Sequence, residues 1–283
     1  MAGVRIRGDH CPGRSNTDWA LGRGGAAMNL TPAADVAALV RDRLRTRHSC
    51  SVIRLGDGEG RLLGWPERVD MPALAQHMMF WFGRCDFSVD EVRRMRRDLE
   101  YAIYTADVVG LPNESNCEKG GYWQEPLRWM TEHDMLEKHI ICDHELHLQL
   151  WREGLLPEIV ASAERVSLIT CRQVVDEMRE FFRLDTLKCY KIPEEGNTGR
   201  QATRHFPDTY NQLFEELKHN AIGELVLVGA GVLGKAYCAW VRRAGGVGLD
   251  IGSLFDGFAQ VDSRSYLGGH LDEFGLGAKG GDE

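Results

Sequence analysis

The sequence predicts an α/β fold in which a mostly parallel β-sheet is flanked by helices within a single domain. Short runs rich in β-branched residues alternate with longer segments of helical periodicity, which is the order expected of parallel strands joined by crossover helices. Two of these runs end at a proline, and two others lead into glycine-bearing loops. The chain of 283 residues is long enough for one large domain of this kind and contains no internal repeat.

The expected elements follow one another along the whole middle of the chain. Thr31-Pro32 has the pattern of a helix N-cap followed by proline at the first helical position. Ser88 is the expected N-cap of a later helix, with acidic residues in its first turn. We expect the main helices at residues 31–45, 70–82, 88–105, 174–182, 207–219 and 235–243. We expect strands at residues 51–55, 107–111, 138–142, 166–170, 187–192, 224–228 and 247–250.

The two ends of the chain are expected to lie outside the folded domain. Residues 1–28 are rich in glycine, arginine and polar residues without periodicity, which predicts a disordered leader, and Met28 is a possible natural start. Residues 265–283 are also mostly glycine and polar, which predicts a flexible tail. Residues 29–264 then form the domain.

Composition and charge narrow the classes of function. The formal net charge of −8 argues against a general nucleic-acid-binding protein, which is usually basic. No apolar run approaches the roughly 20 residues of a membrane span, and the first residues lack the apolar core of a secretory signal. The eight cysteines are scattered without a C-x-x-C pair, which indicates reduced thiols and a cytoplasmic protein.

The stretch Arg54–Glu59, R-L-G-D-G-E, follows the first expected strand and is predicted to be a tight, irregular loop. In such a loop Asp57 and Glu59 can turn toward one point and share a hard divalent cation through their oxygens. Mg²⁺ or Mn²⁺ bound in this way usually also coordinates substrate phosphates, so we interpret the stretch as a metal–diphosphate site. The alternative is an Asp-Gly turn that only reverses the chain.

A second glycine-rich motif lies near the end of the domain. Gly229, Gly231 and Gly234 follow an expected strand and precede a helix, and Asp250 comes 21 positions after the first glycine, at the end of the next strand. These are the elements of a dinucleotide-binding fingerprint. The glycines allow a phosphate to approach the N-terminus of a helix, where the helix dipole favours anions, and Lys235 adds a cation.

The position of this motif favours one interpretation of it. Only 33 residues follow Asp250, whereas a full NAD site usually has several more strands after the fingerprint. A cradle for a nucleoside diphosphate fits this place better, although a purely structural glycine turn stays possible.

Further polar residues follow other expected strands. Asn113 comes directly after the strand at 107–111, where open α/β sheets bind ligands. Arg200 stands in a polar loop before a helix, as a candidate for phosphate contact. The cluster Asp143–His147 can contain a catalytic base or be structural, and its two histidines are too close in sequence for the H-E-x-x-H geometry of zinc proteases. The arginines of 93–97 can meet an anionic acceptor or form a solvated helix face.

Together, the two glycine-bearing motifs resemble the GT-D-fold glycosyltransferases. Residues 52–59 look like the amino-terminal signature of that family, which carries a D-x-E metal motif after its first strand. Residues 227–238 and 245–256 resemble its carboxy-terminal block. The resemblance spans roughly residues 48–262 and is dense only at the two ends.

This resemblance implies a Rossmann-like α/β fold, a nucleotide-sugar donor and a divalent metal, Mn²⁺ or Mg²⁺. By position, Asp57 and Glu59 take the role of metal ligands. Asp256 is a candidate for sugar contact or proton transfer, and the family pattern identifies no catalytic base. The candidate donor-binding residues are Arg54, Gly56, Asn113, Arg200, Gly229, Gly231, Gly234, Lys235 and Asp250.

We therefore expect a metal-dependent glycosyltransferase that moves a sugar from a nucleoside diphosphate donor to an unknown glycan, lipid-linked or protein acceptor. One alternative is an NAD(P)-dependent oxidoreductase that uses the Gly229–Gly234 fingerprint. Another is a protein of the same fold that binds a nucleotide sugar without catalysis.

Overall fold

A parallel sheet of seven strands forms the centre of the fold in the computed structural model, which describes residues 29–194 and 203–261. The predicted leader 1–28, the predicted tail 265–283 and Arg200 lie outside the described residues. The strand order is β3-β2-β1-β7-β6-β4-β5, and every pairing between these strands is parallel. The strands are β1 (Cys50–Arg54), β2 (Val108–Leu111), β3 (Ile140–Asp143), β4 (Arg165–Thr170), β5 (Lys188–Lys191), β6 (Glu224–Gly229) and β7 (Val247–Asp250). Each lies within two residues of an expected strand, so the predicted α/β fold is confirmed.

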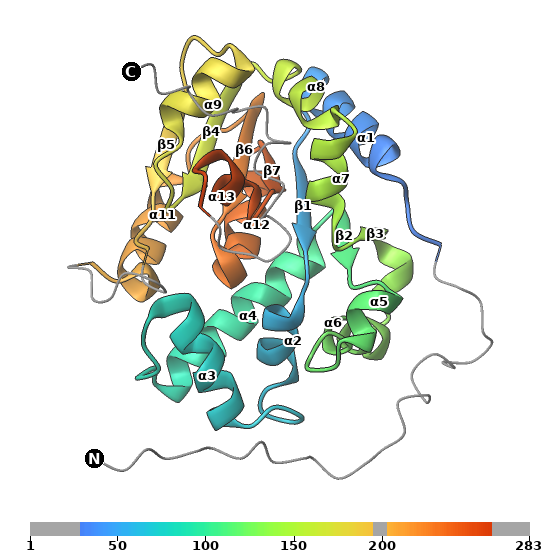
Figure 1. Cartoon of the computed structure of the whole chain (residues 1–283), viewed down its shortest axis with the longest axis vertical. Helices are drawn as coiled ribbons and strands as arrows, with labels where there is room; N and C mark the ends of the chain where they lie inside the picture. The colour runs from blue at the N-terminus through green and yellow to red at the C-terminus, as the bar shows by residue number, and fades with distance from the viewer. Residues whose placement is uncertain (1–28, 195–202, 262–283) are drawn as a thin grey trace, which may run out of the picture.

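Helices cover both faces of the sheet and enclose two separate apolar cores (Figure 1). One face is covered by α2 (Asp57–Gly64), α3 (Met71–Phe82), α4 (Val89–Thr105), α6 (Glu125–Glu132), α11 (Tyr210–Glu216) and α12 (Gly234–Arg243). The other is covered by α1 (Ala33–Arg45), α7 (Leu146–Arg152), α8 (Leu155–Ala161), α9 (Val175–Phe182) and α13 (Leu254–Phe258). The short α5 (Glu114–Glu118) follows β2.

The central strand β1 shows why this sequence forms a three-layer structure. All five of its residues are buried, as expected for a parallel strand with both faces covered. Successive side chains point to opposite faces, so Val52 packs into the core under α1 while Ile53 packs into the core under α4. Buried and exposed residues therefore do not alternate along this strand.

The order of the strands creates a switch point between β1 and β7. From β1 the chain runs outward to β2 and β3, whereas the other four strands lie on the opposite side of β1. In open α/β sheets a crevice forms outside the carboxyl ends of the strands at such a point. In Figure 1, α2, α3 and α6 lie at the end of the molecule toward which β1 points.

The stretch expected as an irregular loop after β1 is instead the start of α2, with Asp57 as its first residue. Glycines disfavour helix by about 1 kcal/mol each, which is why the sequence pattern suggested a loop. Here the glycines permit close packing of the helix. A Cβ atom on Gly58 would lie 2.3 Å from the indole of Trp81, and one on Gly60 would lie 2.1 Å from the carbonyl oxygen of Tyr122.

Two predicted helix starts have different outcomes. Ser88 caps α4 as predicted, and its side chain accepts a hydrogen bond from the backbone N–H of Glu91. Thr31, predicted as an N-cap, is not one, because Pro32 takes that place and α1 begins at Ala33. Thr31 pairs with Cys142 beside β3 instead, and its N–H donates to the carbonyl of Ile141.

The described part of the chain contains no helix that is both long enough and apolar enough to cross a membrane. Its seven cysteines are all free thiols, and four of them are buried. Burial raises the pKa of Cys50 and Cys142 to about 12, so these two thiols are neutral at physiological pH.

Candidate functional site

Four charged side chains meet in a buried network at the carboxyl ends of β1 and β7. The Lys235 ammonium lies 2.8 Å from Glu59 Oε1 and 3.0 Å from Asp250 Oδ2. Arg54 Nη2 lies 3.2 Å from Asp250 Oδ1, and Arg54 Nε donates to the Asp250 carbonyl at 3.1 Å. The exposure of these side chains is between 3% and 9%. We call Arg54, Glu59, Lys235 and Asp250 the charge quartet; its two positive and two negative charges cancel.

Glu59, Lys235 and Asp250 of the charge quartet are ionised at neutral pH. Burial, the largest single influence on Glu59 and Asp250, favours their neutral forms, but the facing cations outweigh it. Lys235, helped by the Gly56 N–H, holds the pKa of Glu59 below its usual value, and Arg54 with Lys235 does the same for the pKa of Asp250. Burial likewise disfavours the charged form of Lys235, but Asp250 and Glu59 raise its pKa above the ordinary value.

Acid is expected to destabilise the fold through this network. Because the pKa values of Glu59 and Asp250 are lowered from 4.5 and 3.8, their contribution is complete above those values and is lost as pH falls from them through the lower pKa values of the folded state. The raised pKa of Lys235 makes its contribution complete below 10.5 and lost only at higher pH. Urea unfolding from pH 7 to pH 3 should show a falling free energy of unfolding. The double variant Glu59→Gln/Lys235→Met should fall less steeply, and an equal slope would contradict this assignment.

Two histidines that follow β3 adjoin the charge quartet. Arg54 Nη1 donates to His147 Nδ1 at 2.8 Å and to the His144 carbonyl at 3.2 Å. Burial and then the Arg54 cation lower the pKa of His144 to about 3, so its imidazole is neutral. The structure thus places His144 and His147 of the cluster Asp143–His147 beside Arg54, while the alternatives of a catalytic base and a structural role stay open. With so low a pKa, His144 is suited to accept a hydrogen bond rather than to remove a proton at neutral pH.

The two acidic residues of α2 have different environments. Glu59 is the third residue of the helix, and its Oε2 accepts from the Gly56 N–H at 2.8 Å, so both its oxygens are engaged. Asp57, the first residue, accepts from the Tyr122 N–H at 2.8 Å and from Arg61 Nε at 3.3 Å. The Asp57 side chain is 21% exposed. Asp57 is therefore the accessible carboxylate of the pair, and Glu59 is the buried one.

The glycine-rich loop lies beside the charge quartet, as expected, but its glycines serve different purposes. A Cβ on Gly229 would lie 2.3 Å from the ring of Phe255, so this glycine allows α13 to pack over the end of β6. Gly231 has a φ of +54°, and its carbonyl accepts from Lys235 Nζ at 3.1 Å. Gly234 is the first residue of α12, which places the N-terminal end of that helix at the site.

Two tryptophans flank the N-terminus of α2. Trp81 of α3 lies against Gly58 and is 3.5 Å from the position that a Cβ on Gly231 would take. Trp123 lies on the other side, 3.5 Å from the Cβ position of Gly56, with its ring edge-to-face with His144 at 5.1 Å between centroids. Trp123 thus lies beside the first turn of α2, where its ring can contact a ligand. Trp81 was not predicted, because no local pattern connects it with Gly58 or Gly231.

Two other candidates, Asn113 and Asp256, are engaged in local contacts. Asn113 caps α5 through its side chain and donates to Asp143 Oδ2 at 3.1 Å. Asp256 Oδ1 accepts from Arg172 Nε at 2.5 Å, and Arg172 also pairs with Glu194. Their predicted contacts with the donor stay predictions, and any ligand there must compete with these bonds.

The described residues contain no group of three or more histidine, cysteine, aspartate or glutamate side chains placed to hold a metal ion. That finding is compatible with Mg²⁺ or Mn²⁺, since such ions are often held by one or two carboxylates together with substrate phosphates. Asp57 and Glu59 supply hard oxygen ligands of this type. A cation that uses Glu59 has to compete with Lys235 for Oε1 or with the Gly56 N–H for Oε2.

Comparison with known proteins adds family information to this geometry. A family model described as "GT-D fold-like domain" matches residues 31–258, which is most of the chain. No curated protein matches the sequence at a significant level. One solved structure, a selenomethionine-substituted domain of unknown function 1792, is similar with a TM-score of 0.44 and 14% sequence identity. The similarity covers 81% of this chain and 79% of that chain.

Proposed function

Because the chain belongs to the family of GT-D fold-like domains, we propose that it is a metal-dependent glycosyltransferase that uses a nucleoside diphosphate sugar as donor. The observation that carries this proposal is the place of Arg54 and Lys235. Both cations are fixed by buried carboxylates at the switch point of the sheet, beside the glycine-rich loop. A diphosphate is the ligand that this combination of cations, loop and helix N-terminus suits best.

The charge quartet has a clear chemical use in such a transfer. When the bond between the sugar and the diphosphate breaks, negative charge develops on the oxygen of the leaving group. Cations that are already held in place stabilise that charge without reorganising. The Lys235 ammonium contacts three oxygens, from Glu59, Asp250 and Gly231. The Arg54 guanidinium contacts Asp250 and His147.

Asp57 and Glu59 are the residues that would hold the divalent cation. When bound, such a cation supplies Lewis-acid stabilisation to phosphate oxygens. Asp57 contributes an accessible carboxylate at the mouth of the site, while Glu59 positions the Lys235 ammonium and the first turn of α2. Trp81 and Trp123 offer flat apolar surfaces on either side of this turn, which suit the base or a sugar ring of the substrates.

The oxidoreductase alternative has less support from the geometry. In that interpretation Asp250 binds the ribose of the cofactor. Here Asp250 is only 3% exposed and pairs with both Arg54 and Lys235, so a ribose hydroxyl would have to displace one of two cations from it.

The proposal is tested by the melting temperature of the full chain with nucleoside diphosphates, nucleotide sugars, NAD⁺ and NADPH, each with Mn²⁺ and with EDTA. A ligand that binds the native state raises the melting temperature by mass action. We expect a shift of several degrees with one nucleoside diphosphate and its sugar, lost on chelation. A shift with NAD⁺ or NADPH that is indifferent to EDTA would replace the proposal with the oxidoreductase. Binding without sugar transfer or donor hydrolysis would favour the non-catalytic alternative.

A further inference from the structure

A cavity of about 660 Å³ lies at the amino ends of the strands, on the edge of the sheet opposite the charge quartet. We call it the amino-edge cavity. Its walls come from α1, the C-terminal end of α4, the 3₁₀ turn Leu136–Lys138, the start of β3 and the end of α12. Cavities of this volume are of the size that binds small molecules. Ligands of parallel α/β sheets usually bind at the carboxyl edge, so this cavity is separate from the proposed active site.

One ion pair in the cavity wall is fully engaged within the protein. Arg242 contacts the two oxygens of Asp107 at 2.7 and 3.3 Å. Asp107 Oδ2 also accepts from the Ser51 N–H at 2.9 Å, which ties the start of β2 to β1. Because both oxygens of the Asp107 carboxylate already accept these hydrogen bonds, Asp107 forms no ion pair with the other two cations of the cavity.

Two other cations of the cavity lack a carboxylate partner within the described residues. The Arg43 side chain makes no hydrogen bond or ion pair there, and its Nε is buried without a partner. The Lys138 ammonium contacts only the sulfur of Met135, at 3.8 Å. The remaining carboxylate of the wall, Glu137, is on an exposed residue. On a chain with a net charge of −8, this is a local excess of positive charge that suits an anion.

His139 adds an acceptor to this set. Its Nδ1 lies 2.9 Å from the Ala106 carbonyl, and a carbonyl can only accept, so Nδ1 carries the hydrogen. In the neutral ring Nε2 is then an acceptor, and it is buried without a partner in the described part of the chain. A buried acceptor of this kind is costly unless it meets a donor, such as a hydroxyl group of a ligand.

Apolar side chains complete the cavity wall. Tyr104 is 51% exposed and Ile140 is 37% exposed, and both are among the large apolar residues left open to solvent. The Tyr104 ring is braced edge-to-face by Trp129, with 5.8 Å between centroids. A fixed aromatic ring next to unpaired cations suits a ligand that has both a planar apolar part and an anionic part.

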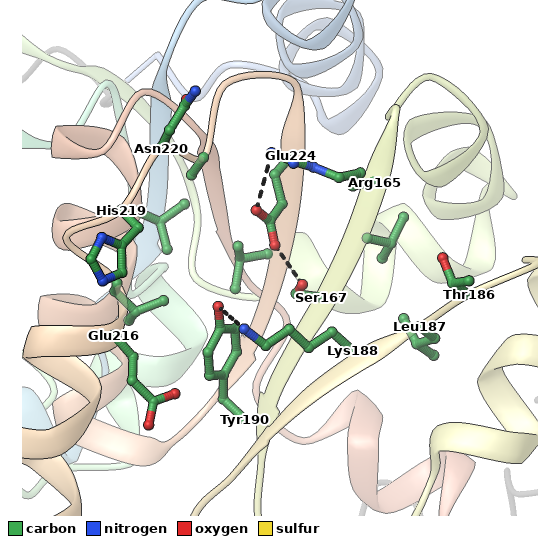
Figure 2. A pocket seen from close by; sticks show the side chains of 15 residues that line it. Arg165, Ser167, Thr186, Leu187, Lys188, Tyr190, Glu216, His219, Asn220 and Glu224 are labelled. Atoms are coloured by element: carbon green, nitrogen blue, oxygen red, sulfur yellow. Dashed lines mark hydrogen bonds and ion pairs between the residues drawn. The ribbon is translucent and has the colours of Figure 1, made fainter.

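A second cavity shows that charged walls alone do not indicate a ligand. The cavity in Figure 2, of about 520 Å³, is lined by polar side chains of β4, β5 and β6 and by the end of α11. There Glu224 and Lys188 each have polar partners in the cavity wall. Glu224 lies between Arg165 and Ser167, and Lys188 donates to the Tyr190 hydroxyl at 2.7 Å. The amino-edge cavity instead combines two cations that lack a carboxylate partner in the described residues with an aromatic ring that is half exposed.

We infer that the amino-edge cavity binds a nucleoside phosphate, with its phosphoryl groups on Arg43 and Lys138 and its base against Tyr104. A ribose hydroxyl is the group that fits His139 Nε2. This site does not depend on the proposed transferase activity, because none of its residues belongs to the charge quartet or to its neighbours.

The test is calorimetric titration of the full chain with pyrophosphate, UDP and ADP in EDTA, combined with hydrogen exchange to locate the bound probe. We expect UDP or ADP to protect residues 104–107 and 137–140. The double variant Arg43→Gln/Lys138→Gln should lose at least about tenfold in affinity for pyrophosphate and for the nucleotide. Tyr104→Ala should weaken only the nucleotide, by about tenfold.

The matched control is Arg45→Gln, which removes an exposed arginine from the same helix outside the cavity and should bind as the wild type does. Should the double variant unfold, Lys138→Gln alone replaces it, because Lys138 is exposed. Unchanged affinity in the variant, protection confined to residues 54–60 and 229–235, or no binding at millimolar concentrations would each overturn the inference.

Discussion

Replacing Lys235 by methionine is expected to lower the free energy of unfolding by about 3–5 kcal/mol. The substitution keeps most of the side-chain volume but removes the ammonium that lies within 3.0 Å of both Glu59 and Asp250. Asp250 keeps Arg54 as a partner, whereas Glu59 is left as a buried carboxylate without a cation, held by the backbone N–H groups of Gly56 and of Glu59 itself. Urea unfolding at pH 7 measures the loss.

Two comparisons isolate the cause of this loss. The double variant Lys235→Met/Glu59→Gln removes the unpaired carboxylate and should recover part of the stability, so the two substitutions should not be additive. Lys218→Met is the matched control, because Lys218 pairs with Glu215 at 2.6 Å on an exposed helix end and such pairs contribute about 0–1 kcal/mol. Equal losses for Lys235→Met and Lys218→Met, or strict additivity in the double variant, would show that the charge quartet does not stabilise the fold.

The Asp57→Asn variant is expected to lose about 10²–10³-fold in sugar transfer while its melting temperature stays close to that of the wild type. Asparagine has the same shape, and its side-chain oxygen can still accept from the Tyr122 N–H. The variant removes the charge of the one accessible carboxylate in the D-x-E pair, and with it the ion pair to Arg61. Glu59→Gln is a less clean test, since it also disturbs the buried pair with Lys235.

Transfer is measured with the donor identified by the melting-temperature panel, across a range of Mn²⁺ concentrations. Asp176→Asn serves as the control, because Asp176 also lies in the first turn of a helix but is 83% exposed and pairs with Arg179. Partial rescue of Asp57→Asn by excess Mn²⁺ would support a metal role for this carboxylate. Normal transfer with native-like melting would exclude that role.

Local sequence patterns were sufficient to predict the sheet. Each strand is a short run bounded by turn residues, the five inner strands are largely buried, and both cores are built from alternate strand side chains. The same reasoning failed at α2, because the glycines that allow Trp81 and Tyr122 to approach that helix are residues that disfavour helix in isolation. Tertiary packing outweighed propensity there.

The candidate site was predictable only in part. The D-x-E stretch and the glycine-rich loop were recognised as motifs, and parallel strands bring such loops to one edge. Neither motif indicates that Lys235 contacts Glu59, which lies 176 positions earlier in the sequence. The ion pair of Asp256 with Arg172 was likewise not predictable from sequence, and the predicted role of Asp256 stays a prediction.

The place of β7 in the sheet also has a consequence for synthesis of the chain. The central strand β1 pairs on one side with β2 but on the other with β7, so Cys50 meets Val247 in register. During synthesis of the chain, β1 to β3 leave the ribosome long before β7. In that interval the edge of β1 that later pairs with β7 has no neighbouring strand. An open edge of this kind is prone to pairing with other chains. Truncation before residue 247 should therefore yield aggregates rather than a smaller folded protein.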